Sequence, residues 1–135
     1  MLRNAPIFAY IPVADLGRAR RFYEQTLGLK PKEEIGGGVV YECAKGTAFF
    51  MYKSAGAGTS KASTAFWAVD DVAAEVAELR ARGVVFEEYD LPGLRTIGGV
   101  AEVEGNYPSK GGIGERAAWF LDSEGNLLGI GQRID

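Results

Sequence analysis

One short pattern occurs twice in the sequence, 56 residues apart, and no other feature restricts the fold as strongly. Val13-Ala14-Asp15 and Val69-Asp70-Asp71 each close an apolar, strand-like run and precede a helical pattern of apolar residues. An aspartate at this point is predicted to cap the helix, because its carboxylate accepts hydrogen bonds from free N–H groups of the first turn. The first helix is predicted over Leu16–Leu27, and Gly28 and Gly83 stand where the two helices end. We interpret the chain as an internal duplication of one strand–helix unit.

Further strand-like runs follow each predicted helix, so that the order β-α-β-β-β occurs twice. They lie at Lys30–Ile35, Val39–Cys43 and Thr47–Tyr52 in the first half, and at Val85–Tyr89, Gly99–Glu104 and Glu115–Leu121 in the second, where a closing strand follows at Leu127–Arg133. The sequence therefore predicts an α+β fold in a single domain, residues 1–135. The domain is expected to consist of two modules, about 1–53 and 63–135, joined by the small-residue linker 54–62.

Composition excludes several classes of protein. No apolar run approaches the roughly 20 residues that cross a membrane. A formal charge of −3 argues against nucleic acid as a partner. Cys43, the single cysteine, excludes an internal disulfide, and together with the lack of a signal-peptide core it favours a cytoplasmic protein. The sequence has no histidine, which removes the commonest metal ligand and the commonest general base at neutral pH.

Four motifs stand in a fixed order: Val13-Ala14-Asp15 before an arginine-rich helix with Phe22-Tyr23, then Leu27-Gly28-Leu29, then Val69-Asp70-Asp71, and finally Phe120-Leu121-Asp122-Ser123-Glu124-Gly125-Asn126. Together they resemble the vicinal oxygen chelate superfamily, which includes glyoxalase I, extradiol dioxygenases, fosfomycin-resistance transferases and bleomycin-resistance proteins. The resemblance covers nearly the whole chain. It implies two β-α-β-β-β modules whose mixed sheets curl around a central cleft (the glyoxalase/bleomycin-resistance/dioxygenase fold), usually in a homodimer.

The resemblance also implies where a metal would bind. Metal-dependent members carry a ligand on the first strand of each half, another on the fourth strand of the first half, and a glutamate after the Gly-Asn-Leu-Leu turn. In this chain the corresponding positions hold Phe8, Thr64, Phe50 or a neighbour of Phe50, and Gly129. None of these is a useful ligand, because a metal site needs three or four nitrogen, oxygen or sulfur donors. We therefore expect no metal and no other cofactor.

The same positions predict a pocket with aromatic walls. In the family's orientation of the strands, Gly129 and Gly131 lie on the cleft side beside large rings, whereas Ile7, Ile11 and other apolar residues face the helices. Two alternatives are open: the rings surround free space, or they close over the glycines and fill the cleft as core. The expected ligand-binding residues are Phe8, Tyr10, Phe50, Thr64, Phe66, Tyr107, Trp119 and Gly129.

Two other features also have two interpretations each. Residues 104–115 form either a lid that brings Tyr107 and Lys110 to a ligand or a plain solvent loop. Glu42, Glu102 and Glu104 either supply a general base or face solvent from alternating strands. No catalytic residue is assigned.

The leading functional hypothesis is a metal-free small-molecule-binding protein of the bleomycin-resistance type. Its ligand would be flat and partly apolar, stacked between aromatic rings, and the acidic charge suits a cation. The alternative is a glyoxalase-like lyase, an isomerase or a dioxygenase-related enzyme, and a third hypothesis is a fold that serves only dimerisation or partner binding. The expected partners are a small molecule and a second copy of the chain, without nucleic acid or membrane.

Overall fold

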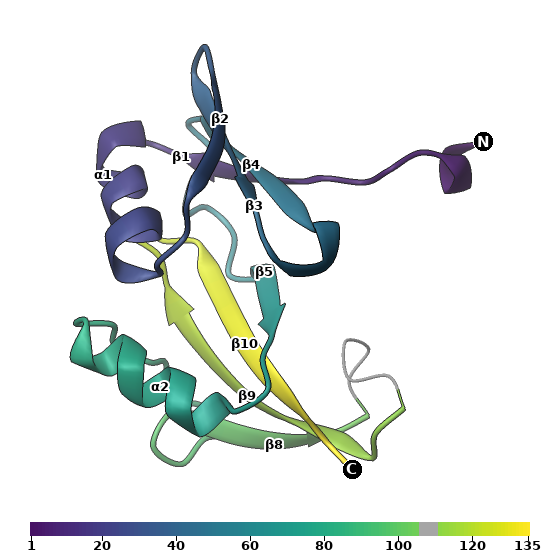
Figure 1. The fold of residues 1–135 in the computed structure, drawn as a ribbon. Helices are drawn as coiled ribbons and strands as arrows, with labels where there is room; N and C mark the ends of the chain where they lie inside the picture. Colours follow the sequence, from purple (N-terminus) through teal and green to yellow (C-terminus); the bar gives the residue numbers. More distant parts are fainter. Residues whose placement is uncertain (106–110) are drawn as a thin grey trace. The chain divides into compact units, whose positions relative to one another are not determined.

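The computed structural model describes residues 1–105 and 111–135, and this part of the chain is α+β with two four-stranded mixed sheets (Figure 1). The chain divides into two compact units. The first is Met1–Ser60 with Ser123–Gly125, and the second is Lys61–Asp122 with Asn126–Asp135. The turn Ser123–Gly125 therefore belongs to the first unit, although the strands on either side of it belong to the second.

The first unit contains one sheet of order β1-β4-β3-β2, in which β1 and β4 are parallel and the other pairs antiparallel. Its elements are η1 (Leu2–Asn4), β1 (Ala9–Val13), α1 (Leu16–Arg21), the π-helical segment η2 (Phe22–Thr26), β2 (Pro31–Ile35), β3 (Gly38–Glu42), η3 (Ala44–Gly46) and β4 (Ala48–Lys53).

The second unit repeats this topology with the sheet order β5-β10-β9-β8, in which β5 and β10 are parallel. Its elements are β5 (Ser63–Ala68), α2 (Val72–Ala81), the two-stranded hairpin β6 (Asp90–Leu91) and β7 (Leu94–Arg95), β8 (Val100–Glu104), β9 (Gly114–Leu121) and β10 (Leu127–Ile134). The strand orders of the two sheets correspond one to one. The predicted β-α-β-β-β order is confirmed in the first half, and in the second half it is completed by β10, which was predicted as an additional closing strand.

Both helices begin as the repeated motif predicts. The Asp15 carboxylate accepts a hydrogen bond from Arg18 N at 3.0 Å, and the Asp71 carboxylate accepts one from Ala74 N at 3.1 Å. The first helix differs from the expected single helix, because α1 ends at Arg21 and the chain continues as a π-helical segment. The wider turn buries Tyr23 completely.

One predicted strand is wrong. Val85–Tyr89 makes only an isolated bridge, from Phe86 to Phe120, instead of a strand. The backbone of Tyr89, at the end of this segment, bonds instead to Thr96, which follows the next hairpin. Tyr89 N donates to Thr96 Oγ1 at 2.7 Å, and Thr96 N donates to Tyr89 O at 2.9 Å. Apolar alternation in this segment reflects burial of Phe86 against the sheet, without continuous strand pairing.

The cores lie on the sheet faces that were predicted to face the helices. Ile11, Val13, Ala118, Phe120, Leu128 and Ile130 are all buried. Ile7 was placed on the same face and is 94% exposed, because β1 begins only at Ala9 and Ile7 has no paired strand beside it. No helix in residues 1–105 and 111–135 is long and apolar enough to cross a membrane.

Candidate functional site

The first unit has a cavity of about 440 Å³ on the face of its sheet that does not carry the core. Three of the predicted ligand-binding residues line it: Phe8, Tyr10 and Phe50. The rings of Tyr10 and Phe50 meet edge to face with centroids 5.1 Å apart. Phe8 and Tyr10 are nevertheless 53% and 62% exposed. The cavity therefore has an aromatic wall with ring surface that another molecule can cover.

A glycine on β3 gives Phe50 its position. A Cβ atom on Gly38 would collide with Cζ and Cε1 of the Phe50 ring, so that only glycine allows the ring to lie across β3. Gly38 pairs with Tyr52 of β4 in the sheet register. The Tyr52 ring in turn stacks on Phe50 at an interplanar angle of 7°. The aromatic wall thus depends on one residue without a side chain.

The opposite wall of the cavity is charged. Lys32, Glu33 and Glu42 line it, and Lys32 Nζ forms an ion pair with Glu42. The register between β2 and β3 is irregular between Pro31 and Glu33, so that two residues of β2 occupy the space of one. Such a bulge re-aims side chains, and it brings the neighbours Lys32 and Glu33 to the same cavity. The Glu42 carboxylate raises the pKa of the Lys32 ammonium, chiefly through their hydrogen bond.

In the second unit, the space beside Gly129 is filled by side chains. A methyl group at this position would lie 2.5 Å from Phe66 Cδ2 and 2.9 Å from Trp119 Cδ1, both closer than side chains tolerate. At this glycine the geometry favours the second of the two alternatives, in which rings close over the strand. Phe66, Trp119 and Gly129 are therefore brought together, as packed neighbours in one sheet. Thr64 is the extra residue of a bulge where β5 meets β10.

A buried carboxylate lies on the same face and was missed by sequence reasoning. Glu115 is 1% exposed, and its side chain occupies the space beside Gly131, together with the tip of the Phe66 ring. The alternation 115, 117, 119 along β9 was available as a signal, since it places Glu115 on the face of Trp119. The three glutamates that were considered as bases are all exposed instead: Glu42, Glu102 and Glu104. Tyr107 and Lys110 lie outside the described residues.

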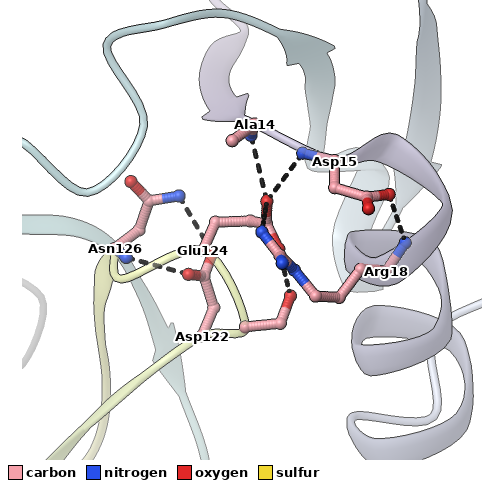
Figure 2. Close-up of polar contacts among 7 residues, drawn as sticks. Ala14, Asp15, Arg18, Asp122, Glu124 and Asn126 are labelled. Atoms are coloured by element: carbon pink, nitrogen blue, oxygen red, sulfur yellow. Dashed lines mark hydrogen bonds and ion pairs between the residues drawn. The ribbon is translucent and has the colours of Figure 1, made fainter.

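The turn between β9 and β10 is closed by hydrogen bonds of its own polar side chains (Figure 2). Asn126 N donates to Asp122 Oδ1 at 2.8 Å, and Asn126 Nδ2 donates to Asp122 Oδ2 at 3.0 Å. Both side chains are buried. Gly125 adopts a φ of 87°, which glycine reaches without strain. These bonds close the turn that carries Glu124.

Glu124 is bound within the first unit, to which the turn belongs. Its carboxylate accepts hydrogen bonds from Ala14 N at 3.0 Å and Asp15 N at 2.8 Å, and it pairs with the Arg18 guanidinium at 2.8 Å (Figure 2). The Glu124 side chain is fully buried. Arg18 therefore lowers the pKa of Glu124 to about 2, helped by the Asp15 backbone and by Ser123. These contacts give the motif 120–126 a structural role.

The residues at the family's metal positions do not fit a metal. Phe8 and Phe50 carry no donor atom, and the side of Gly129 that a glutamate would occupy is taken by Phe66 and Trp119. Within residues 1–105 and 111–135, no three His, Cys, Asp or Glu side chains lie close enough together to hold a metal ion. A single threonine hydroxyl, that of Thr64, cannot replace three or four donors. No step of a mechanism is therefore assigned to a metal.

A second hollow in the second unit, about 870 Å³, contains none of the predicted site residues. The hairpin β6–β7 and the edge strand β8 line it, with Asp90, Arg95, Glu102 and Glu104 among its residues. Arg95 pairs with Asp90 at 3.1 Å, and Glu102 pairs with Arg116 at 3.0 Å. Its charges are thus largely matched by exposed ion pairs, and we place the candidate site at the aromatic cavity of the first unit.

Comparison with known proteins agrees with this fold. A family profile described as Glyoxalase/Bleomycin resistance protein/Dioxygenase superfamily matches residues 7–130. No curated protein sequence matches the chain.

Solved structures share the architecture at low sequence identity. A glyoxalase/bleomycin resistance protein/dioxygenase from Alicyclobacillus acidocaldarius has a TM-score of 0.69 at 17% identity, over 98% of this chain and 93% of that one. A virulence protein from Salmonella typhimurium also has a TM-score of 0.69, at 18% identity over 96% of this chain and 97% of that one. A lactoylglutathione lyase from Agrobacterium tumefaciens has a TM-score of 0.60 at 16% identity, over 95% of this chain and 93% of that one. At these identities the likeness concerns the fold alone.

Proposed function

The chain belongs to the Glyoxalase/Bleomycin resistance protein/Dioxygenase superfamily, and on that premise we propose that it binds a flat, partly apolar small molecule without a metal, in the manner of the bleomycin-resistance type. The binding site is the aromatic cavity of the first unit. Phe8, Tyr10 and Phe50 stack on the ligand, while Phe66 and Trp119 of the second unit pack over Gly129.

The observation that carries this proposal is the exposed aromatic wall. Tyr10 keeps 62% of its surface exposed although its ring already contacts Phe50 and Tyr52. Exposed rings beside a cavity of about 440 Å³ are costly to leave in water and are typical of ligand sites. A tricyclic aromatic molecule fits this volume.

Titration with acridine, a flat neutral tricycle in mildly alkaline buffer, tests the proposal. We expect saturable binding that quenches acridine fluorescence. Tyr10→Ala should weaken this binding by about tenfold, since an aromatic contact contributes about 0.5–1.5 kcal/mol beyond area burial. Val85→Ala, which removes an exposed apolar side chain in the second unit, is the matched control. Binding that is unaffected by Tyr10→Ala would contradict the proposed site.

The alternative function, an enzyme of the lyase, isomerase or dioxygenase type, has one observation in its favour. Glu115 is a buried carboxylate beside Phe66 and Gly131, and such a group can act as acid or base. Formation of lactoylglutathione by the purified protein, abolished in Glu115→Gln, would favour the enzyme.

Protein purified without chelator is expected to carry less than about one-tenth of an equivalent of metal. Stoichiometric metal after dialysis would contradict metal-free binding.

We further propose that the protein forms a homodimer. β1 and β5 are edge strands in the order of their sheets, and Ile7 and Phe8 before β1 are exposed apolar side chains. Unpaired edges with apolar flanks are commonly covered by a second copy. Light scattering at micromolar concentration is expected to give twice the chain mass of 14.5 kDa. A monomer mass would contradict this.

A further inference from the structure

The two walls of the aromatic cavity differ in chemistry. Phe8 and Tyr10 form one side, Val40 and Phe50 the floor, and Lys32, Glu33 and Glu42 the other side. All of these belong to the first unit. A molecule in the cavity therefore touches ring faces on one side and charged groups on the other.

The charged side carries a net negative charge. The Lys32 ammonium is paired with Glu42, and their side chains are 59% and 47% exposed. Within residues 1–105 and 111–135, no cationic side chain lies within ion-pair distance of the Glu33 carboxylate. Two carboxylates and one ammonium leave one net negative charge at the rim. Glu33 also attracts Lys32, but it is the carboxylate of the two that has no ion-pair contact within the described residues.

The aromatic side of the cavity also attracts a positively charged ligand. The faces of aromatic rings carry a negative quadrupole potential, which attracts cations within about 6 Å of the ring centroid. Tyr10 is an exposed tyrosine ring in contact with Phe50 and Tyr52. A cation in the cavity would thus be stabilised from both walls, whereas an anion would meet the ring faces and Glu33 unfavourably.

We propose that this cavity selects a flat organic cation, with the aromatic system lying against Tyr10 and Phe50 and the positive charge directed at Glu33. The inference rests on the proposed function, since it names the class of ligand for the same site. Glu33 is a specificity-determining residue, and the bulge in β2 that places it beside Lys32 is the structural cause.

Three acridines of nearly the same shape test the sign of the charge: the cation N-methylacridinium, neutral acridine and the anion acridine-9-carboxylate. We expect the cation to bind about tenfold more tightly than acridine and the anion to bind most weakly. Glu33→Gln keeps the shape of the side chain and removes its charge. It should weaken N-methylacridinium about fivefold and leave acridine unchanged, because an exposed charge pair at contact distance is worth about 1 kcal/mol.

Glu104→Gln is the matched control, since it makes the same change of charge at an exposed site in the second unit. It should alter neither affinity. Added salt should reduce the preference for the cation, because Glu33 is exposed and its charge is screened.

The outcomes separate the two proposals. A preference for the cation that Glu33→Gln removes supports the inference. Equal binding of cation and neutral acridine, both weakened by Tyr10→Ala, overturns the charge selection and leaves the proposed site in place. Tighter binding of the carboxylate also overturns it. If none of the three acridines binds, the proposed function fails, and the inference fails with it.

Discussion

In the first module β4 pairs Phe50 with Tyr10 of β1, whereas in the second module the corresponding strand β10 pairs Gly129 with Phe66 of β5. In the first module a large side chain on this face belongs to the inner strand β4: it is Phe50, whose ring crosses Gly38. In the second module the large side chains belong to the neighbouring strands, whose Phe66 and Trp119 cover Gly129. The two modules thus differ at the inner strand, which has Phe50 in one and Gly129 in the other, whereas the edge strand has a large ring in both, Tyr10 and Phe66.

This difference at the inner strand has consequences for function. In the first module Tyr10 keeps an exposed ring beside a cavity, and in the second the rings are used in packing against glycines. The duplicated topology therefore does not imply two equivalent sites. A glycine in a strand indicates a close neighbour here: Phe50 at Gly38, and Phe66 and Trp119 at Gly129.

The helix starts show a second contrast. Both helices have an aspartate cap, and each receives one more acceptor from the C-terminal hairpin: α1 from the Glu124 carboxylate, and α2 from Gln132, whose Oε1 accepts from Val72 N at 3.0 Å. One acceptor is an ion paired with Arg18, and the other is a neutral amide. The same local motif is thus stabilised by different chemistry.

The largest expected effect is at the charged helix start. Glu124→Gln should lower the free energy of unfolding by about 3 kcal/mol, because a buried carboxylate that accepts from two backbone N–H groups and from Arg18 is replaced by an amide whose NH₂ faces those donors. Urea melts measure this directly. Glu102→Gln makes the same change in the exposed pair with Arg116 and should cost less than about 0.5 kcal/mol. Equal losses of unfolding free energy in Glu124→Gln and Glu102→Gln would show that the Glu124 carboxylate contributes no more than an exposed ion pair.

The same contrast should appear in the pH dependence of stability. The pKa of Glu124 is lowered from 4.5 to about 2 by its partners in the folded state, so that its contribution is complete above about pH 5. As pH falls from 5 towards 2, protonation removes it. The difference in unfolding free energy between the parent and Glu124→Gln should therefore shrink over this range. A difference in unfolding free energy that stays constant from about pH 5 to about pH 2 would contradict the ion pair. Glu24, whose pKa is also lowered by Arg20, contributes equally to both proteins, so its effect cancels in the difference.

The next effect concerns the glycine that is covered by rings. Gly129→Ala should destabilise the fold by about 2 kcal/mol, because the added methyl group overlaps Phe66 and Trp119. Gly36→Ala is the control, since its Cβ would meet nothing within 4 Å, and it should change stability by less than about 0.5 kcal/mol. If Gly129→Ala leaves the stability unchanged, there is free space beside this strand, as the open-pocket alternative requires.

The smallest effect is at the neutral helix start. Gln132→Met should cost about 1 kcal/mol, the net value of one hydrogen bond, because Val72 N loses its side-chain acceptor. A loss as large as that of Glu124→Gln would erase the distinction between the two helix starts. Chemical denaturation of both variants under the same conditions decides this.

Local patterns predicted the elements that depend on near neighbours in the chain. The aspartate caps and the alternation that buries Ile11 and Leu128 were correct, because capping and burial follow from periodicity. Val85–Tyr89 failed as a strand because its pairing depends on the hairpin that follows. Ile7 failed because alternation says nothing about where pairing begins.

The candidate site was less accessible to sequence reasoning. Phe8, Tyr10 and Phe50 were expected in a pocket and do line one. The charged wall was not expected, because a bulge in β2 breaks the alternation that assigns side chains to faces. The burial of Glu115 also depends on Gly131 in another strand, which leaves room for its side chain.

The sequence by itself determined the duplicated β-α-β-β-β order, the family and the absence of metal donors at the family's positions, since each depends on residue type and spacing. Only the tertiary structure decided which glycines are covered, where exposed rings border a cavity, and that Glu124 of the last hairpin is bound at the start of the first helix. The physical reason is that packing and ion pairing depend on distances between residues remote in the chain. Here 109 positions separate Asp15 from Glu124.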